Sequence, residues 1–477
     1  MENTRKAELF ERTPIPKAVF TLAVPTVLSS LVMVLYNLAD TYFVGMLLDP
    51  VQNSAVTLAA PVLLAFNAVN NLFGVGSSSM MSRSLGAKDY DTVRRSSAFG
   101  FYCALLSGIL FSVLATAFRV PLLGLLGADA VTAQATMDYM GWTVSCGAAP
   151  AILNVVLAYL VRAEGATLHA SIGTMSGCLL NIVLDPIFIL PWGLGMGAAG
   201  AGLAPFLSNC FACLYFFVLL FVRRGTTYVC LLPALARPGR ELVRGVFGVG
   251  VPASIQNLLN VTGMTVLNNF TAVFGTDALA AMGISYKINM IPMYIAMGIS
   301  QGLMPLVSYN YGSGNVSRLK KAVVFAQKVS LSFMAVVSVC YFFASESLIG
   351  MFMKTEAVVA YGSRFLRRMC IAQPFLCMDF LAVGVFQACG LGQYALLFAI
   401  LRKIVLEIPA LYVLNYFSPL YGLACAQTVA EVVLAAAAAV ILTRLFRRMA
   451  AEGTPRPPRR GEKWSPPPVL WRARGRY

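Results

Sequence analysis

Long apolar stretches, separated by short polar breaks, recur along almost the whole chain. A helix needs about 20 mostly apolar residues to cross the hydrocarbon core of a bilayer, and twelve stretches reach that length. The first is too long and too polar at its end to be a signal-peptide core. We therefore predict an all-α polytopic membrane protein with twelve transmembrane helices, near 18–46, 55–81, 96–118, 136–161, 169–190, 197–222, 244–274, 279–308, 322–345, 358–388, 393–416 and 419–446.

The composition and the placement of charge agree with this pattern. Of the 477 residues, 58% are hydrophobic and only 12% are charged, whereas soluble domains carry about 25% charged residues. A net charge of +16 would also suit a nucleic-acid-binding protein, but the basic residues gather in alternate loops between the predicted spans. The positive-inside rule then places both termini in the cytoplasm. We expect a multi-pass protein of the inner (plasma) membrane that contacts the lipid bilayer and no nucleic acid.

The chain also repeats itself. The segment 76–95 aligns with 302–321 at a shift of 226, which pairs Gly76 with Gly302 and Gly86 with Gly312. The tripeptide "AEG" at 163–165 aligns with "ACG" at 388–390 at a shift of 225. Six spans in each half, an even number, predict two six-helix lobes related by a parallel pseudo-twofold repeat. The predicted division is a cytoplasmic N-terminal segment (1–17), an N-lobe (18–222), a cytoplasmic linker (223–243), a C-lobe (244–446) and a disordered, basic Pro/Arg-rich cytoplasmic tail (447–477).

Several function classes are disfavoured by the residues that the chain lacks. His169 is the only histidine, so a multi-histidine metal site is excluded, and histidine acid–base chemistry would rest on this residue alone. The phosphate-binding stretch G-x-x-x-x-G-K-[ST] is absent. The eleven cysteines lie mostly inside spans, where cysteine usually acts as a small apolar residue. We expect neither an enzyme nor an ATP-driven pump, and no cofactor.

Acidic residues inside the spans are the strongest pointers to function. A carboxylate at the bilayer centre costs about 2.5–3.5 kcal/mol, so a functional role is weighed first and a structural anchor second. Asp40 shares a helical face with Asn37 and Tyr36, and Asp185 follows Asn181 by four residues. Two carboxylates and two amides in a dry bundle could hold one cation, either a proton or Na⁺. The acids that we single out within spans are Asp40, Asp185, Asp379, Glu407 and Glu431.

The second half carries a different set of polar residues. Gln256 lies in span 7, which has no acid, while Lys287 and Asp379 each stand alone in spans 8 and 10. Met290 begins a methionine stripe at helical spacing, which suits either an adaptable cavity or plain packing. Lys403 and Glu407 are four residues apart, and the spacing leaves a structural ion pair and a transport role both open.

Five motifs in register resemble the multidrug and toxic compound extrusion (MATE) family, in particular its DinF-like prokaryotic branch. They are "LAVPTVLSSLVMVLYNLADTYFVG" (22–45), "GSSSMMSRSLGAKDYDTVRR" (76–95), "YLVRAEGATLHASIG" (159–173), "NIVLDPIFI" (181–189) and "GMGAAGAGLA" (195–204). The resemblance covers about residues 10–446. It implies a cation-coupled antiporter, with two six-helix lobes around a central cleft, that exports amphipathic and often cationic drugs or dyes. We expect a monomer without an obligate protein partner.

The resemblance also implies roles for single residues. The coupling ion of DinF-like relatives sits in the N-lobe, at positions matching Asp40, Asn181 and Asp185, and a span 4 asparagine corresponds to Asn154. Pro25 matches the proline at which span 1 bends in some relatives.

One departure from the family pattern bears on the choice of ion. Where the family often has a threonine ligand, this chain has Pro205, which tilts the expectation toward H⁺ over Na⁺, although Ser208 could compensate. The rival function is a flippase for lipids or lipid-linked oligosaccharides from the same superfamily. Flippases usually line the cleft with more cationic residues, so the sequence favours efflux.

Overall fold

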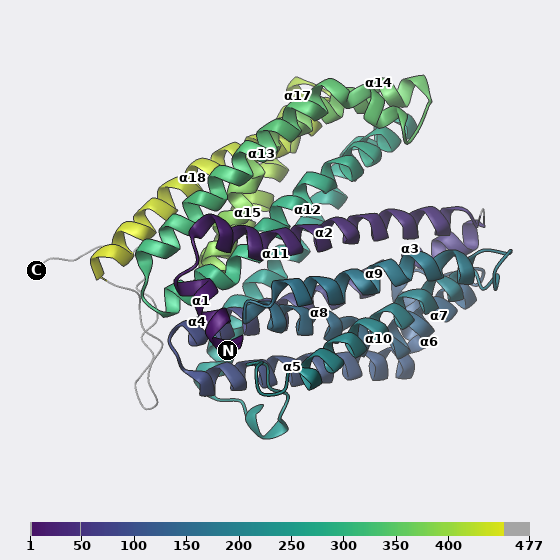
Figure 1. The fold of residues 1–477 in the computed structure, drawn as a ribbon. Helices are drawn as coiled ribbons and strands as arrows, with labels where there is room; N and C mark the ends of the chain where they lie inside the picture. The colour runs from purple at the N-terminus through teal and green to yellow at the C-terminus, as the bar shows by residue number, and fades with distance from the viewer. Residues whose placement is uncertain (1, 48, 453–477) are drawn as a thin grey trace, which may run out of the picture.

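The computed structural model describes residues 2–47 and 49–452, and every regular element in that part of the chain is helical. Two bundles meet at the end that carries α1 and α4 and diverge toward the end that carries α14 and α7 (Figure 1). The N-lobe consists of α2 (Ile15–Gly45), α3 (Pro50–Asn70), η1 (Asn71–Val75), α4 (Gly76–Gly86), α5 (Tyr90–Ala117), α6 (Arg119–Leu126), α7 (Ala133–Met140), η2 (Gly141–Cys146), α8 (Ala148–Ala163), α9 (Thr167–Ile189) and α10 (Ala198–Val222).

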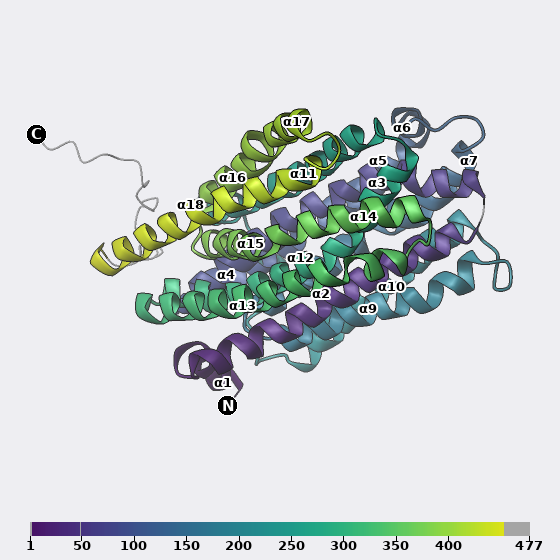
Figure 2. The same ribbon diagram turned by 90° about the horizontal axis from the view of Figure 1, so that it is seen from above.

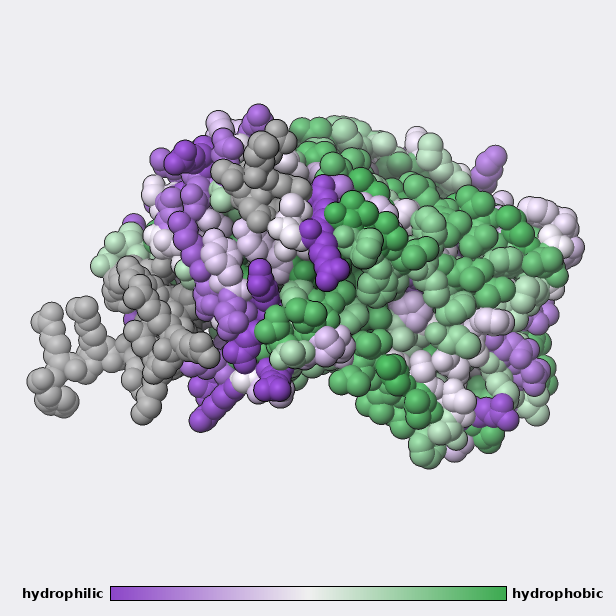
Figure 3. Space-filling view, turned by 60° about the horizontal axis from the view of Figure 1, so that its bottom comes forward, coloured by the Kyte–Doolittle hydropathy of each residue, from purple (hydrophilic) through white to green (hydrophobic). Residues whose placement is uncertain are grey.

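The C-lobe repeats this layout after the short helix η3 (Pro233–Leu235). It consists of α11 (Arg240–Ala272), α12 (Thr276–Gly312), α13 (Val316–Gly350), α14 (Glu356–Met369), η4 (Cys370–Ala372), α15 (Gln373–Ala388), α16 (Gly392–Ile400), η5 (Leu401–Glu407), α17 (Ile408–Phe417) and α18 (Leu423–Glu452). Seen from above, α12 lies beside α2 of the other lobe (Figure 2). A broad apolar surface separates the hydrophilic residues at the two ends of the molecule, as expected of a multi-pass membrane protein (Figure 3).

The predicted all-α fold with two six-helix lobes is confirmed, with one qualification for the number of spans. Within the described residues, ten helices are long and apolar enough to cross a membrane. The pair α7–η2 and α8, bent by 48°, makes an eleventh. The remaining predicted span, near 393–416, is divided among α16, η5 and α17 and contains three charged residues, Arg402, Lys403 and Glu407, so it does not form one long uncharged helix. Two short helices were not predicted: α6, and α1 (Glu2–Glu11) within the N-terminal segment.

Most helices extend beyond the apolar windows that predicted them. The C-lobe helix α12 continues four residues past the expected end at 308, and α18 continues to Glu452. The predicted tail therefore begins with six helical residues, and its remainder, 453–477, lies outside the described residues. Helix ends reach the polar zone at the membrane surface, where apolar periodicity no longer marks them.

Pairs of equivalent contacts confirm the internal repeat. The Ser82 hydroxyl donates to the Ala163 carbonyl at 2.7 Å, and the Ser308 hydroxyl donates to the Ala388 carbonyl at 2.9 Å. Both partners of the second bond are the repeat equivalents of the first. Likewise, Asp89 caps α5 by accepting from the Thr92 amide, and Asn315 caps α13 by accepting from the Arg318 amide. The sequence shift of about 226 residues thus relates local hydrogen bonds as well as residue identities.

The two lobes approach backbone to backbone where α4 crosses α12, and we call this region the closed end. A Cβ atom on Gly86 would lie 2.0 Å from the Tyr309 carbonyl oxygen, and one on Gly312 would lie 1.9 Å from the Arg83 carbonyl oxygen. These two glycines are repeat equivalents, so the crossing is symmetric. Small residues allow membrane helices to approach backbone to backbone. Every residue from Gly302 to Gly312 is buried at this contact.

Candidate functional site

The N-lobe brings two carboxylates together near the ends of two packed helices. Asp40 lies in the last turns of α2, Asp185 lies near the end of α9, and these helices pack against each other. Asp185 is fully buried, whereas Asp40 is half-buried. Their carboxyl groups are close enough to interact electrostatically. The two acids singled out in the sequence therefore belong to one cluster.

Asp185 and its neighbour Asn181 are buried without partners. In the part of the chain that the structure describes, neither oxygen of Asp185 and neither side-chain polar atom of Asn181 has a hydrogen-bond partner. Leaving such a group unpaired costs about 1–3 kcal/mol, and it calls for an explanation in a native fold. Three of these four atoms are oxygens, and on one face of α9 they can receive a cation, because carboxylate and amide oxygens are hard ligands.

Two tyrosines lie near the acids. Tyr36, predicted from its spacing to Asp40, and Tyr139, which the sequence did not point to, both interact electrostatically with Asp40 and Asp185. Tyr139 lies in α7, just before the π-helical segment η2. A Cβ atom on Gly202 would lie 2.7 Å from its carbonyl oxygen, so α10 packs directly on the backbone of Tyr139. No spacing in the sequence indicates that Tyr139 lies near the acids; its position depends on this tertiary contact.

The other predicted N-lobe residues have different surroundings. The Asn154 amide donates to the side-chain oxygen of Asn209 at 2.9 Å and to the Pro150 carbonyl at 3.1 Å. Asn37 is exposed, and its backbone carbonyl accepts a bond from the Thr41 hydroxyl. The Ser208 hydroxyl is buried and has no partner among the described residues. Asn154 is therefore engaged with α10, and Asn209 is its partner that the sequence did not reveal.

The helix α2 runs through Pro25 without a break. A proline cannot donate to the carbonyl four residues earlier, which is that of Thr21. The Thr167 hydroxyl of α9 approaches this freed carbonyl at 3.4 Å. The proposed hinge is thus held by a neighbouring helix rather than by α2 itself.

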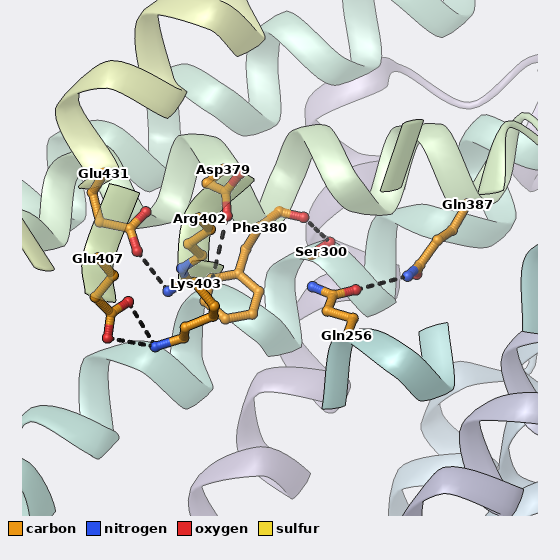
Figure 4. A network of polar contacts seen from close by, with 9 residues as sticks. All are labelled: Gln256, Ser300, Asp379, Phe380, Gln387, Arg402, Lys403, Glu407 and Glu431. Carbon is orange, nitrogen blue, oxygen red and sulfur yellow. Dashed lines mark hydrogen bonds and ion pairs between the residues drawn. The ribbon is translucent and has the colours of Figure 1, made fainter. Parts of the chain in front are cut away.

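The C-lobe contains a buried network of ion pairs (Figure 4). Arg402 of η5 lies between Glu431 of α18, at 2.6 Å, and Asp379 of α15, at 3.5 Å. Lys403 contacts both oxygens of Glu407 at 2.7 Å. Asp379 is the one acid singled out in its own span, and Arg402 reaches it from another helix. Since each charge has an oppositely charged neighbour, the network can hold α15, η5 and α18 together.

The four predicted C-lobe site residues do not form one group. Gln256 accepts a hydrogen bond from Gln387 at 3.3 Å, apart from the pair that Asp379 makes. Lys287 is exposed and Met290 is half-buried. Within residues 2–47 and 49–452, no hydrogen bond or ion pair joins Lys287 or Met290 to Asp379.

Known proteins share both the sequence pattern and the fold. The family model MatE matches residues 25–187 and 252–413, two matches that begin 227 residues apart. The chain is 33% identical over 446 residues to the multidrug export protein MepA of Staphylococcus aureus (strain MRSA252), covering 93% of this chain and 97% of the relative. An outward-facing multidrug resistance MATE family transporter superimposes with a TM-score of 0.87 at 25% identity, covering 93% and 98%.

A third comparison concerns a MOP superfamily transporter from Pyrococcus furiosus Vc1, for which a binding pocket of reversed polarity suggests a different function. Its TM-score is 0.86 at 25% identity, and it covers 94% of this chain and 99% of that one. Because a fold shared this closely hosts pockets of opposite polarity, it does not by itself define a substrate. The double match, the long alignment and the two-lobed fold nevertheless agree: this chain belongs to the MatE (MATE) family of membrane transporters, not to a family of enzymes.

Proposed function

We propose that this protein is a cation-coupled multidrug antiporter of the inner (plasma) membrane, with both termini in the cytoplasm. It exchanges H⁺ or Na⁺ for amphipathic, often cationic compounds by alternating access between its two lobes. The observation that carries the coupling is the fully buried, unpartnered Asp185 and Asn181 beside Asp40. The export direction is supported by the multidrug export function named for the MepA relative.

The proposed coupling follows from charge. Two carboxylates held near each other in a poorly solvated bundle repel, and a bound cation removes that repulsion. Cation binding would therefore favour a tighter arrangement of α2 on α9, and release would loosen it. A membrane potential, negative inside, supplies about 2.3 kcal/mol per charge per 100 mV to this exchange. Helix α2 also packs against α12, so its shift is transmitted to the C-lobe.

The local chemistry favours the proton as the coupling ion. Pro205 offers neither a hydroxyl nor an amide N–H, and Ser208 is the buried hydroxyl available nearby on α10. Gly177, one turn before Asn181, faces the Ser208 backbone at 3.3 Å from its projected Cβ. With few neutral oxygen ligands, the cluster suits a proton shared among carboxyl groups better than a fully coordinated Na⁺.

The decisive experiment is dye efflux from proteoliposomes with imposed pH or Na⁺ gradients. We compare wild type, Asp40→Asn and Asp185→Asn, with Asp277→Asn, an exposed acid in the first turn of α12, as the matched control. Each cluster variant should lose gradient-driven efflux while the control keeps it. Full efflux in both cluster variants would overturn the N-lobe coupling model. A response to pH but not to Na⁺ would identify the ion.

The alternative function that the efflux experiment tests is that of a flippase. Such proteins need free cationic groups for a pyrophosphate, yet Arg402 and Lys403 are bound to carboxylates within the C-lobe. Lys287, the other cationic residue that we singled out inside a span, is exposed. Lipid scrambling without efflux of any amphipathic cation would favour the flippase.

A further inference from the structure

The first helix, α1, is tied to the C-lobe although it is continuous with the N-lobe. The guanidinium of Arg318 donates to the carbonyls of Phe10, at 2.6 Å, and of Leu9, at 3.3 Å. It also donates to the Thr13 carbonyl. Carbonyls at a helix C-terminus otherwise lack partners, so Arg318 caps α1 from α13. Only Arg12, Thr13 and Pro14 separate α1 from α2, and α1 thus spans the boundary between the lobes.

Two residues of α12 strengthen this attachment. The Tyr309 hydroxyl donates to the Glu11 carboxylate at 2.7 Å, and its ring stacks on Phe10 with 4.7 Å between centroids. The Asn310 amide donates to the Phe10 carbonyl at 3.3 Å. The helix is therefore held by α12 and α13 of the C-lobe at the closed end.

The Phe10 ring also reaches the opposite lobe. It is fully buried, and a Cβ atom on Gly165 would lie 2.7 Å from its ring. Gly165 has a φ of +89° in the turn between α8 and α9, so only glycine fits easily and the ring seats directly on the backbone. The preceding Glu164 carboxylate accepts from the Tyr228 amide at 2.7 Å, which fixes this turn to the linker. One side chain thus lies between Tyr309 of the C-lobe and Gly165 of the N-lobe.

The internal repeat explains why a side chain is needed there. The repeat equivalents of Tyr309 and Gly165 are Arg83 and Gly390. Arg83 covers Gly390 directly, since a Cβ on Gly390 would lie 2.2 Å from its guanidinium. On the other side of the pseudo-twofold axis the same crevice is closed by Tyr309 and Phe10 together. Arg83 covers Gly390, whereas Gly165 is covered by Tyr309 together with Phe10 of the N-terminal helix. The N-terminal helix thus makes the two sides of the closed end equivalent.

We propose that α1 is a latch on the closed end, with Phe10 as the gating residue that must leave Gly165 before the lobes separate there. The proposal rests on alternating access, the proposed transport mechanism. Because Arg318, Tyr309 and Asn310 hold α1 on the C-lobe, the lobes can separate at this end only when Phe10 leaves Gly165. A weaker latch shifts the equilibrium toward separation without touching the cation cluster.

The native cysteines provide a test that needs neither substrate nor gradient. Cys389 is 1% exposed and directly precedes the Gly390 that Arg83 covers, so separation of the lobes uncovers it. Cys213 and Cys377 are buried inside the N-lobe and the C-lobe respectively. Alkylation rates of the three thiols are measured by peptide-resolved mass spectrometry on the purified protein. We expect Phe10→Ala to raise the rate at Cys389 at least tenfold and to leave Cys213 and Cys377 unchanged.

Two further variants make the result unambiguous. Arg318→Ala leaves Phe10 in place but removes the cap, and it should raise the Cys389 rate less than Phe10→Ala does. Glu8→Ala, an exposed site on the same helix, should change none of the three rates. An unchanged Cys389 rate in both latch variants overturns the proposal, and so does an equal rise of all three thiols, which signals unfolding. Since no transport is measured, the result is independent of the efflux experiments.

Discussion

Asp185 and Glu431 are both fully buried carboxylates, but their surroundings differ. Glu431 pairs with Arg402 at 2.6 Å, whereas Asp185 has no hydrogen-bond partner among the described residues. A buried charge in an ion pair contributes to structure, because removing its partner leaves a buried charge without compensation. An unpaired one is retained at a cost to stability, which is common at functional sites. The two acids therefore call for opposite expectations on substitution.

At Asp185, we expect substitution to separate activity from stability. Asp185→Asn keeps the size of the side chain and breaks no bond within the protein, so the melting temperature in detergent should not fall. The same variant should lower gradient-driven dye efflux at least tenfold, because the amide cannot bind and release a cation. A large drop in melting temperature would mean that Asp185 has a structural partner and would contradict the assignment.

The sequence predicted the acids of the N-lobe but only some of the residues around them. Asp40, Asp185 and Asn181 were recognisable because a polar group in an apolar span is costly wherever it points. Tyr139 and Asn209 were not recognised, since only tertiary packing brings Tyr139 near the acids and Asn209 to its partner Asn154. For the same reason the sequence showed the Lys403–Glu407 pair, four residues apart, but not the Arg402–Glu431 pair between helices.

At the scale of the elements, α15, η5 and α18 are connected by the ion pairs of Arg402 with Asp379 and Glu431. Arg402→Gln would leave Asp379 and Glu431 buried without their shared cation. Breaking a buried ion pair in this way typically costs about 3–5 kcal/mol. We expect a clear fall in the melting temperature of the variant, measured by thermal unfolding in detergent.

An exposed pair in the same lobe is the matched control. Arg367 and Glu346 are 3.0 Å apart, and their side chains are 38% and 66% exposed. Such surface pairs contribute about 0–1 kcal/mol, so Arg367→Gln should change the melting temperature little. Equal effects of the two substitutions would show that the buried network does not hold the three helices together.

The glycine crossing of α4 and α12 makes a second prediction at this scale. Gly312→Ala places a methyl group 1.9 Å from the Arg83 carbonyl oxygen, so the helices must move apart. Overpacking of this kind costs about 1–3 kcal/mol, and Gly86→Ala should cost about as much because it is the repeat equivalent. Gly283→Ala is the control, since its added methyl meets no atom within 4 Å. Thermal unfolding would contradict the close crossing if the three variants were equally stable.

Apolar length predicted the spans but not their interruptions. Four of the predicted spans contain short π- or 3-10-helical segments, η1, η2, η4 and η5. These segments depend on how neighbouring helices pack, which a hydrophobic window does not record. Likewise α1 was missed because its residues are polar on average, and it is held by contacts with residues about 300 positions away.

For the whole molecule, the direction of transport depends on which side of the membrane the closed end faces. Basic loops gather on the side that carries α1 and the linker, so we predict from the positive-inside rule that the closed end faces the cytoplasm. The lobes then diverge toward the outside, the arrangement from which an exporter releases its substrate. Single cysteines at exposed lysines test this topology: Lys354→Cys between α13 and α14, and Lys320→Cys at the closed end.

The native exposed cysteines Cys146 and Cys340 are first replaced by serine. A membrane-impermeant maleimide should then label Lys354→Cys in intact cells, but Lys320→Cys only after permeabilisation. The reverse pattern would place the closed end outside, so that the divergent lobes would face the cytoplasm. The same structure would then be an inward-open state, and the latch at α1 would guard the outer gate. The labelling pattern therefore determines whether release from the latch precedes uptake of substrate from the cytoplasm, as export requires.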